Sequence, residues 1–239
     1  MKNKALNSTG FTLIELVVVL SVILILVAIL VPSMGNFATD ANFLKVERDL
    51  KTIGLTIIRM KSDVGHSCIK RNSDLKCTKS NRVDLLAGDG PDVVASDVLS
   101  ADFSSAEMQS ATVNWDDDGS TNASMRDQFV LNMPSYPIPR ENINNQPGSF
   151  RILGWRGVYI SPPIGPDPWG RKYLINSVFL EVASDSASGN GEGQRPGGWS
   201  YDVFVISAGS NGLYETLFAQ EGAVASGDDM IFVVAGDTR

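Results

Sequence analysis

The sequence predicts an α+β fold in which a long N-terminal helix, first transmembrane and then amphipathic, packs on a C-terminal antiparallel β-sheet, with an enlarged loop-rich middle region. Three observations predict this fold. Residues 11–31 form an apolar run that carries a single charge. Apolar residues then recur at three- and four-residue steps as far as residue 60. Beyond residue 155, short runs of β-branched and aromatic residues alternate with turn clusters.

Length and composition narrow the function classes. The 239 residues are enough for one folded domain of ordinary size with appendages. A formal net charge of -7 argues against a broad face that binds nucleic-acid phosphates. The chain has no Gly-x-Ser-x-Gly elbow and no glycine-rich phosphate loop, and it has one histidine, His66. The sequence therefore predicts that the protein is not an enzyme.

The first predicted element is the apolar run of residues 11–31. At about 1.5 Å per residue, a helix of this length crosses the hydrocarbon core of a bilayer. Two lysines in the first four residues favour a cytoplasmic N-terminus with the bulk of the chain outside. The small residues Ser8, Thr9 and Gly10 precede the apolar run, whereas an ordinary secretory signal places them after it. Cleavage at Gly10 would leave the membrane anchor on the mature protein.

The stretch "GFTLIELVVVLSVILILVAILVPS" resembles the N-terminus of type IV pilins and of the pseudopilins of type II secretion. The resemblance implies a leader, residues 1–10, that a prepilin peptidase removes between Gly10 and Phe11. It also implies N-methylation of the new amine of Phe11. Glu15 becomes the fifth residue of the mature chain, where this family has its glutamate. The resemblance places the anchor, residues 11–31, in the bacterial inner membrane as a single pass and the C-terminal domain in the periplasm.

Glu15 is expensive inside an apolar helix, at about 2.5–3.5 kcal/mol near mid-bilayer and less near the interface. The amine of Phe11 in a neighbouring subunit would offset this cost only when the two subunits have the correct axial offset. Glu15 is therefore predicted to set the register of assembly. The alternative is a glutamate that reaches the headgroups and needs no partner. Thr12 and Ser21 are predicted to bond to their own helix backbone.

A second helical segment, residues 32–65, is predicted to follow a kink or a local melt at Pro32, because proline removes a backbone hydrogen bond and clashes with the preceding turn. Its periodicity gives an amphipathic helix from Gly35 to about Val64. The apolar positions are Phe43, Val46, Leu50, Ile53, Ile57 and Met60. This stripe is expected to pack on the protein's own globular domain; a free coiled coil is the alternative.

The middle region, residues 66–154, is predicted to be a loop-rich insertion. Cys68 and Cys77 are close enough in sequence for one disulfide in an oxidising compartment, and two unpaired thiols are the alternative. The stretch "CIKRNSDLKCTKSNR" has five basic residues and one acid, which suits an anion-binding or DNA-binding patch or, alternatively, a solvated loop. His66 lacks the further ligands of a zinc site and is interpreted as structural.

One acidic stretch of this middle region has part of a calcium-loop pattern. In "NWDDDGSTNASM", Asn114, Asp116 and Asp118 precede Gly119 with the spacing of an EF-hand loop. Met125 then occupies the position that needs a bidentate glutamate, so the stretch is interpreted as an acidic loop. The proline-rich "MPSYPIPR" that follows is predicted to be an extended connector.

The last segment, residues 155–239, is predicted to be the sheet. Its strands are expected in "WRGVYI", "YLINSVFLEV", "YDVFVIS" and "MIFVVA". "DPWG" fits a type I turn in which Asp167 bonds to the backbone ahead of it. The glycine- and serine-rich residues 184–198 are expected to be a flexible connector.

Residues 157–231 resemble the globular domain of the major pseudopilin of type II secretion, protein G. The resemblance implies a calcium site formed by Asn211, Asp228, Asp229 and carbonyls of the loop that begins at Ser207. Glu215 is a further candidate ligand. Calcium chemistry agrees, because the ion takes six to eight oxygens and residues from 202 onward include six acids and one base. A solvated acidic tail is the alternative. The family has aspartate where this chain has Asn211.

The predicted function is a structural subunit of an inner-membrane-anchored type II secretion pseudopilus that polymerises through its N-terminal helix and supports protein export from a periplasmic filament. The partners that the resemblance implies are other copies of the chain, minor pseudopilins, the prepilin peptidase and the inner-membrane assembly platform. The alternative is a type IV pilin or minor pilin whose surface serves adhesion, motility or DNA uptake. The long middle region leaves a major and a specialised subunit both open.

Overall fold

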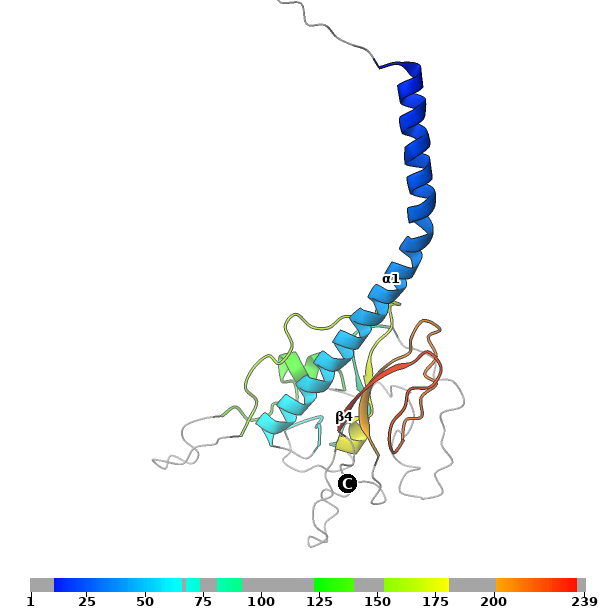
Figure 1. The fold of residues 1–239 in the computed structure, drawn as a ribbon. Helices are drawn as coiled ribbons and strands as arrows, with labels where there is room; N and C mark the ends of the chain where they lie inside the picture. Colours follow the sequence, from blue (N-terminus) through cyan, green and yellow to red (C-terminus); the bar gives the residue numbers. More distant parts are fainter. Residues whose placement is uncertain are drawn as a thin grey trace, which may run out of the picture. The chain divides into compact units, whose positions relative to one another are not determined.

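The computed structural model describes residues 11–65, 68–73, 81–91, 123–139, 153–180 and 201–235, without the side chains of 31–36 and 235. The chain forms two units, residues 1–44 and 45–239. The helix α1, Leu13–Val64, contributes to both (Figure 1).

The described part of the first unit is the helical segment from Leu13, preceded by Phe11 and Thr12. Among the described residues, one helical stretch is long and apolar enough to cross a membrane, the 18 residues Leu13–Leu30, and none of it is buried. The backbone stays helical through Pro32, so the predicted local melt is wrong, whereas the kink stays a prediction. A proline removes one backbone hydrogen bond, and the remaining bonds of a 52-residue helix continue on both sides of it.

In the second unit, one side of α1 forms part of the hydrophobic core. The buried side chains follow steps of three and four residues, and they are Val46, Leu50, Ile53, Ile57, Met60 and Val64. The predicted amphipathic stripe that packs on the protein's own domain is confirmed from Val46 to Met60, whereas Phe43 is half-buried and belongs to the first unit. α1 ends at Val64, and Gly65 follows it with φ 70° and donates its N–H to the Lys61 carbonyl at 2.9 Å.

The sheet of the second unit has four antiparallel strands in the order β1-β2-β3-β4. The strands are β1 Leu86–Ala87, β2 Leu174–Ile175, β3 Val203–Ser207 and β4 Met230–Ala235. The helix α1 crosses the sheet closely, because a Cβ at Gly54 would lie 2.6 Å from Cε1 of Phe232 in β4. The α+β class with an antiparallel C-terminal sheet is therefore as predicted.

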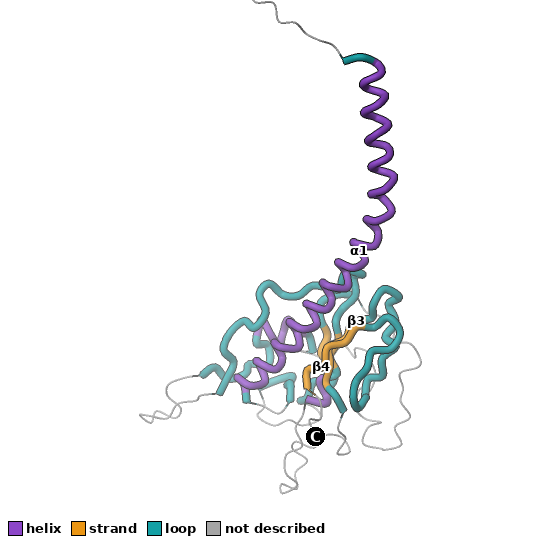
Figure 2. The backbone as a smooth tube through the Cα atoms, viewed as in Figure 1, coloured by secondary structure: helices purple, strands orange, loops and turns teal. Residues whose placement is uncertain are grey.

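The extent of the strands differs from the sequence prediction. β3 and β4 fall within the predicted runs, and they are the strands labelled in Figure 2, where loop makes up much of the second unit. The run 173–182 forms only the two residues of β2 and then the 3-10 helix η3, Ser177–Leu180. The run 155–160 is loop, so the strand predicted there is wrong. Instead of a ladder, it forms two isolated backbone hydrogen bonds with the middle region. The N–H of Trp155 donates to the Pro137 carbonyl at 2.8 Å, and the N–H of Tyr159 donates to the Phe129 carbonyl at 2.9 Å.

Described parts of the middle region belong to the folded domain. β1 comes from it, and so does the short π-helix η2, Asp127–Leu131, which buries Gln128 and Phe129. Tyr136 links three segments: its hydroxyl accepts the N–H of Lys70 at 2.8 Å and donates to Gln128 Oε1 at 3.0 Å. Gln128 Nε2 returns a bond to the Lys70 carbonyl at 2.8 Å. Burial raises the pKa of Tyr136, so its hydroxyl keeps the proton that this network uses.

Candidate functional site

The first turn of α1 forms a capping box between Thr12 and Glu15. Oε2 of Glu15 accepts the backbone N–H of Thr12 at 2.8 Å and its hydroxyl at 2.7 Å. The Thr12 hydroxyl in turn accepts the N–H of Glu15 at 3.4 Å. This reciprocal arrangement satisfies helix N–H groups that have no partner within the helix, and it places an acid where the helix dipole favours it.

Oε1 of Glu15 accepts no hydrogen bond from the described residues, so one carboxylate oxygen is open to a further partner. The prediction for Thr12 is wrong, because its hydroxyl bonds to Glu15 rather than only to backbone. The sequence contained the signal, a threonine followed three residues later by a glutamate. Ser21 is as predicted, since its hydroxyl donates to the Val18 carbonyl at 2.7 Å.

The apolar surface after this turn is uncovered. The side chains of Leu13–Leu30 are exposed on every face of the helix, and Glu15 is the one charged residue in this stretch. Water is a poor environment for so large an apolar area, so it requires lipid or neighbouring helices. The geometry thus offers an apolar rod with one partly satisfied carboxylate at its N-terminal end.

The second candidate site is the loop between β3 and β4, where the two predicted acids close the loop. Oδ2 of Asp228 accepts three bonds: from the N–H and hydroxyl of Ser210, each at 2.7 Å, and from the N–H of Asn211 at 2.8 Å. Oδ2 of Asp229 accepts the N–H groups of Glu215 at 2.7 Å and Thr216 at 2.6 Å. Asp228 therefore connects the start of the loop to its end, and Asp229 connects the middle of the loop to its end.

The other oxygen of each acid lacks a partner. Oδ1 of Asp228 and Oδ1 of Asp229 are buried and have no hydrogen bond. Burial raises the pKa of Asp229 to about 6, although the bonds from Thr216 and Glu215 act against this rise. For Asp228, burial also raises the pKa, but the bonds from Ser210 and Asn211 outweigh it and the net pKa is lowered. Two unpartnered buried carboxylate oxygens are costly, and a cation would satisfy them.

Asn211 and Glu215 belong to the same hydrogen-bond network. The amide of Asn211 accepts the N–H of Leu213 at 2.7 Å and donates to Glu215 Oε2 at 2.9 Å. Glu215 Oε2 also accepts the N–H of Asp228 at 3.3 Å. In the part of the chain that the structure describes, no three Asp, Glu, His or Cys side chains gather around one metal-binding point. A calcium ion here would need Asn211 and backbone carbonyls beside Asp228 and Asp229.

Arg171 lies at the same loop, and the sequence analysis missed it. Its guanidinium donates to the carbonyl of Gly209 at 2.6 Å and to that of Ser210 at 3.4 Å. These are carbonyls of the loop predicted to coordinate calcium. The residue Gly212 has no room for a side chain, because a Cβ there would collide with the guanidinium. Arg171 thus supplies a positive charge that already holds part of the loop.

The DPWG turn positions Arg171. Oδ1 of Asp167 accepts the N–H groups of Trp169 at 3.0 Å and Arg171 at 2.9 Å, as the turn prediction requires. Its Oδ2 accepts the hydroxyl of Ser207 at 2.8 Å, which joins the turn to the end of β3. The loop is therefore fastened at its first residues by the turn and at its last residues by Asp228.

Several predicted residues lie outside the described part of the chain. They are Gly10, His66, Cys77, Asn114, Asp116, Asp118 and Gly119. Cys68 is described and buried. The disulfide between Cys68 and Cys77 stays a prediction.

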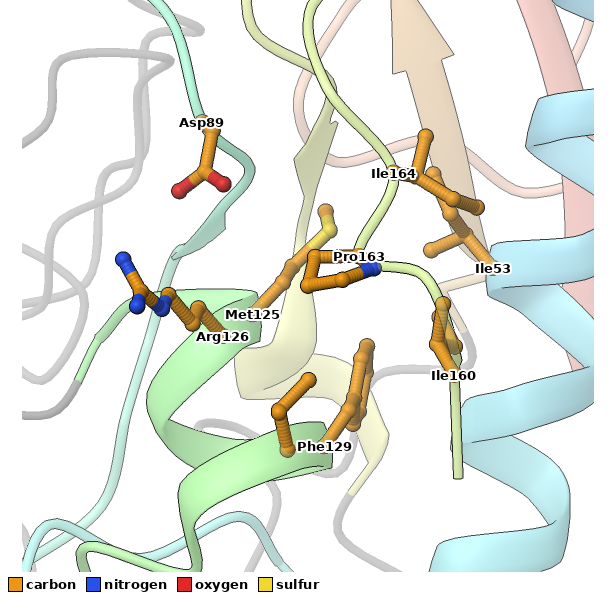
Figure 3. Close-up of a pocket in the computed structure, with 9 residues that line it drawn as sticks. Ile53, Asp89, Met125, Arg126, Phe129, Ile160, Pro163 and Ile164 are labelled. Atoms are coloured by element: carbon orange, nitrogen blue, oxygen red, sulfur yellow. The ribbon is translucent and has the colours of Figure 1, made fainter. Parts of the chain in front are cut away.

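A small apolar pocket lies between α1, η2 and the loop after Ile160 (Figure 3). Its lining includes Ile53, Phe129 and Ile160, and the charged side chains of the lining are Asp89 and Arg126. The pocket brings no nucleophile together with a general base. That the protein is not an enzyme stays a prediction from the sequence.

Residues 6–31 match the family model described as the prokaryotic N-terminal methylation motif. The chain carries a type IV pilin-like leader. Comparisons with curated proteins and with solved structures give no match. The matched segment includes Gly10, Phe11 and Glu15, and the motif indicates a pilin-like or pseudopilin precursor that a prepilin peptidase processes for filament assembly. The apolar helix Leu13–Leu30 is consistent with a single-pass membrane anchor.

Proposed function

We propose that the chain is a structural subunit of an inner-membrane-anchored type II secretion pseudopilus, which polymerises through its N-terminal helix to support protein export. The observation that carries the proposal is the uncovered apolar helix Leu13–Leu30 directly after a methylation motif, with Glu15 in its first turn. Such a helix lies in the bilayer in the free subunit and packs among equivalent helices in the polymer.

Glu15 acts at two stages in this mechanism. In the free subunit, the two bonds from Thr12 to Oε2 reduce the cost of holding a carboxylate in an apolar surrounding. In the polymer, the positively charged amine of Phe11 in a neighbouring copy pairs with the open Oε1. The pairing is favourable only at one axial offset, because a displaced neighbour leaves both charges unpaired in an apolar core. The register of the filament follows from this condition.

The same proposal includes the processing steps and the partners. The prepilin peptidase cuts between Gly10 and Phe11, and the new Phe11 amine is methylated. The inner-membrane assembly platform then extracts the subunit into a periplasmic filament that also contains minor pseudopilins. The periplasm is oxidising, which suits a disulfide between Cys68 and Cys77.

Calcium is the proposed cofactor. The residues that would hold it are Asp228 and Asp229 through their unpartnered Oδ1 atoms, with Asn211 as a neutral oxygen ligand. When bound, the ion supplies positive charge that stabilises the closed form of the loop between β3 and β4. The carbonyls of Gly209 and Ser210 accept hydrogen bonds from Arg171, so other loop carbonyls would complete the shell.

The alternative function, a type IV pilin or minor pilin with a binding surface, has one observation in its favour. Described parts of the long middle region, including η2 and the residues around Tyr136, are built into the folded domain and so can present a fixed surface. The two functions differ in location. Filaments beyond the outer membrane favour the surface pilin, and filaments confined to the periplasm favour the pseudopilus.

The test is Glu15→Gln in the full chain, expressed with its own assembly machinery. We expect loss of filaments and of protein export with normal amounts of subunit in the membrane, because the amide cannot pair with the Phe11 amine. Glu47→Gln, an exposed acid in the same helix, is the matched control and should assemble normally. Normal filaments from Glu15→Gln would refute the assembly mechanism.

A further inference from the structure

The outward side of α1 in the second unit is basic and partly apolar. From Lys45 to Ser62, the exposed side chains include four bases and a single acid, Glu47. Two exposed apolar side chains lie among them, Leu55 with 52% of its surface accessible and Ile58 with 43%. We call Arg48, Lys51, Leu55, Ile58 and Arg59 the outer face of α1.

Among the described residues, no ion pair involves Arg48, Lys51 or Arg59, although Glu47 lies four residues before Lys51 and Asp63 four residues after Arg59. Lys51 and Arg59 stand four residues before and after Leu55, so the three side chains form one row along the helix. In the described residues, α1 forms ion pairs from Asp49 to Lys45 and from Asp63 to Arg156, and none of these involves the row. The outer face of α1 is therefore net positive around two exposed apolar side chains, Leu55 and Ile58.

A second surface of the same unit has the opposite character. No lysine, arginine or histidine occurs from residue 201 to residue 235. Within this stretch the segment 213–224, which we call the acidic loop, exposes three apolar side chains, and they are Leu213, Leu217 and Val224. It carries Glu221, which is exposed, and Glu215, which is half-buried. Tyr214 and Phe218 are almost fully buried, so the loop is anchored and its exposed side chains have a fixed direction.

The two surfaces are complementary in apolar exposure and in charge. Each presents exposed apolar side chains, and the charges around them are positive on the outer face of α1 and negative on the acidic loop. Charges at the rim of such a contact contribute to the choice and register of the partner more than to affinity. They belong to different elements of one unit, the helix and the connection from β3 to β4 (Figure 1).

We propose that the outer face of α1 docks on the acidic loop of a second copy of this chain. A contact between two different surfaces is heterologous, and when the rotation does not close a ring it repeats as an open helical polymer. The inference rests on the proposed function and adds a second contact to it. The N-terminal helices fix the axial offset through Glu15, and this contact fixes how the folded domains meet.

The first experiment is cross-linking of full-length chains in membranes that contain the assembly machinery. One tagged chain carries Leu55→Cys and a differently tagged chain carries Leu217→Cys, and a short thiol-reactive cross-linker is added. We expect a cross-link between the two chains and much weaker 55–55 and 217–217 products. Ile138→Cys, a more exposed apolar position outside both surfaces, replaces Leu217→Cys in the control. The parental chain controls for its own two cysteines.

The second experiment reverses charges in the cysteine pair. Arg48→Glu with Lys51→Glu should lower the 55–217 product about tenfold, because acids then face acids. Glu221→Lys in the partner chain should restore most of it, whereas the conservative Arg48→Lys should change little. All three positions are exposed, so the thermal midpoint of the domain should stay unchanged, and that measurement separates lost contact from misfolding.

The outcomes separate this surface from the proposed function. If filaments form without a cross-link between positions 55 and 217, the docking surface is overturned and the pseudopilus proposal stays intact. An equally strong cross-link between position 55 and Ile138→Cys has the same consequence. A 55–217 product that responds to charge reversal and rescue supports the surface even where filaments are absent, an outcome that would instead refute the pseudopilus proposal. Retention of duplex DNA that depends on Arg48 and Lys51, without the 55–217 product, assigns the basic face to nucleic acid and overturns the inference.

Discussion

The two units of this chain differ in whether the apolar side chains of α1 are exposed or buried. In the first unit, every apolar side chain of Leu13–Leu30 is exposed, and Glu15 uses one oxygen within its own helix turn. In the second unit, α1 buries one side completely and leaves charged residues on the other. The N-terminal half of α1 therefore needs lipid or neighbouring helices to cover its apolar surface. The C-terminal half is stabilised by packing on its own domain. Folding and assembly are therefore separable by mutation.

The largest expected effect on folding comes from Leu50→Ala, in the half of α1 that packs on the sheet. The side chain is 1% accessible, so its loss leaves a cavity and should lower the free energy of unfolding by about 2–5 kcal/mol. Tryptophan fluorescence during thermal unfolding is the measurement, since all four tryptophans lie in the second unit. Leu20→Ala, in the exposed half, is the control. A similar loss from Leu20→Ala would contradict the division between the two halves.

Calcium should have the next largest effect, because Asp228 and Asp229 each leave a buried oxygen unpartnered in the same loop. Calcium at about 100 times its Kd should stabilise the domain by about 2.7 kcal/mol. The measurement is the thermal midpoint with calcium and with a chelator. Asp229→Asn should remove most of the difference. Equal midpoints with and without chelator would reject the metal and leave Arg171 as the cation of the loop.

Gly54→Ala tests how closely α1 approaches the sheet. An added Cβ would collide with the ring of Phe232, and such overpacking should cost about 1–3 kcal/mol. Helix propensity alone favours alanine over glycine, so the direction of the change is informative. Gly165→Ala is the control, since a Cβ there meets nothing within 4 Å. Stabilisation by Gly54→Ala would show that the two elements are less tightly packed than described.

Thr12→Val should have the smallest effect on stability, and only in the first unit. It removes the hydroxyl that donates to Glu15, so the first turn of α1 should lose about 0.5–2 kcal/mol of stability. Amide hydrogen exchange over the first turn, in detergent, is the measurement, and Thr12→Ser should retain the protection. Filament yield should fall with Thr12→Val while domain melting stays constant. Unchanged exchange would mean that Thr12 does not cap the helix.

Local patterns predicted the features that depend on few residues close in sequence. The methylation motif, the apolar stripe from Val46 to Met60 and the turn at Asp167 are of this kind. β3 and β4 were also predictable, because each is a run of β-branched or aromatic residues between turn residues. The pairing of Thr12 with Glu15 also corresponds to a local pattern, the capping box.

Features that depend on distant partners were not predictable in the same way. β1 has two residues and is a strand only because Leu86 and Ala87 pair with β2. The run at residues 155–160 has the composition of a strand. The N–H groups of Trp155 and Tyr159 nevertheless form isolated bonds with carbonyls of the middle region and no strand ladder. Arg171 reaches carbonyls 38 and 39 residues away. No window of sequence contains both members of such a pair.

The sequence by itself determined an apolar helix long enough to cross a membrane, the methylation motif, the single acid near the start of the helix and the presence of two adjacent acids before β4. The tertiary structure decided that Oδ1 of each of these two acids is buried without a partner, that Arg171 holds the loop that faces them, and that the basic side of α1 stays uncovered. The physical reason is the separation of the interacting residues along the chain. The length of an apolar run and the capping of a helix depend on residues close in sequence. Burial and charge pairing depend on which distant surfaces the fold brings together.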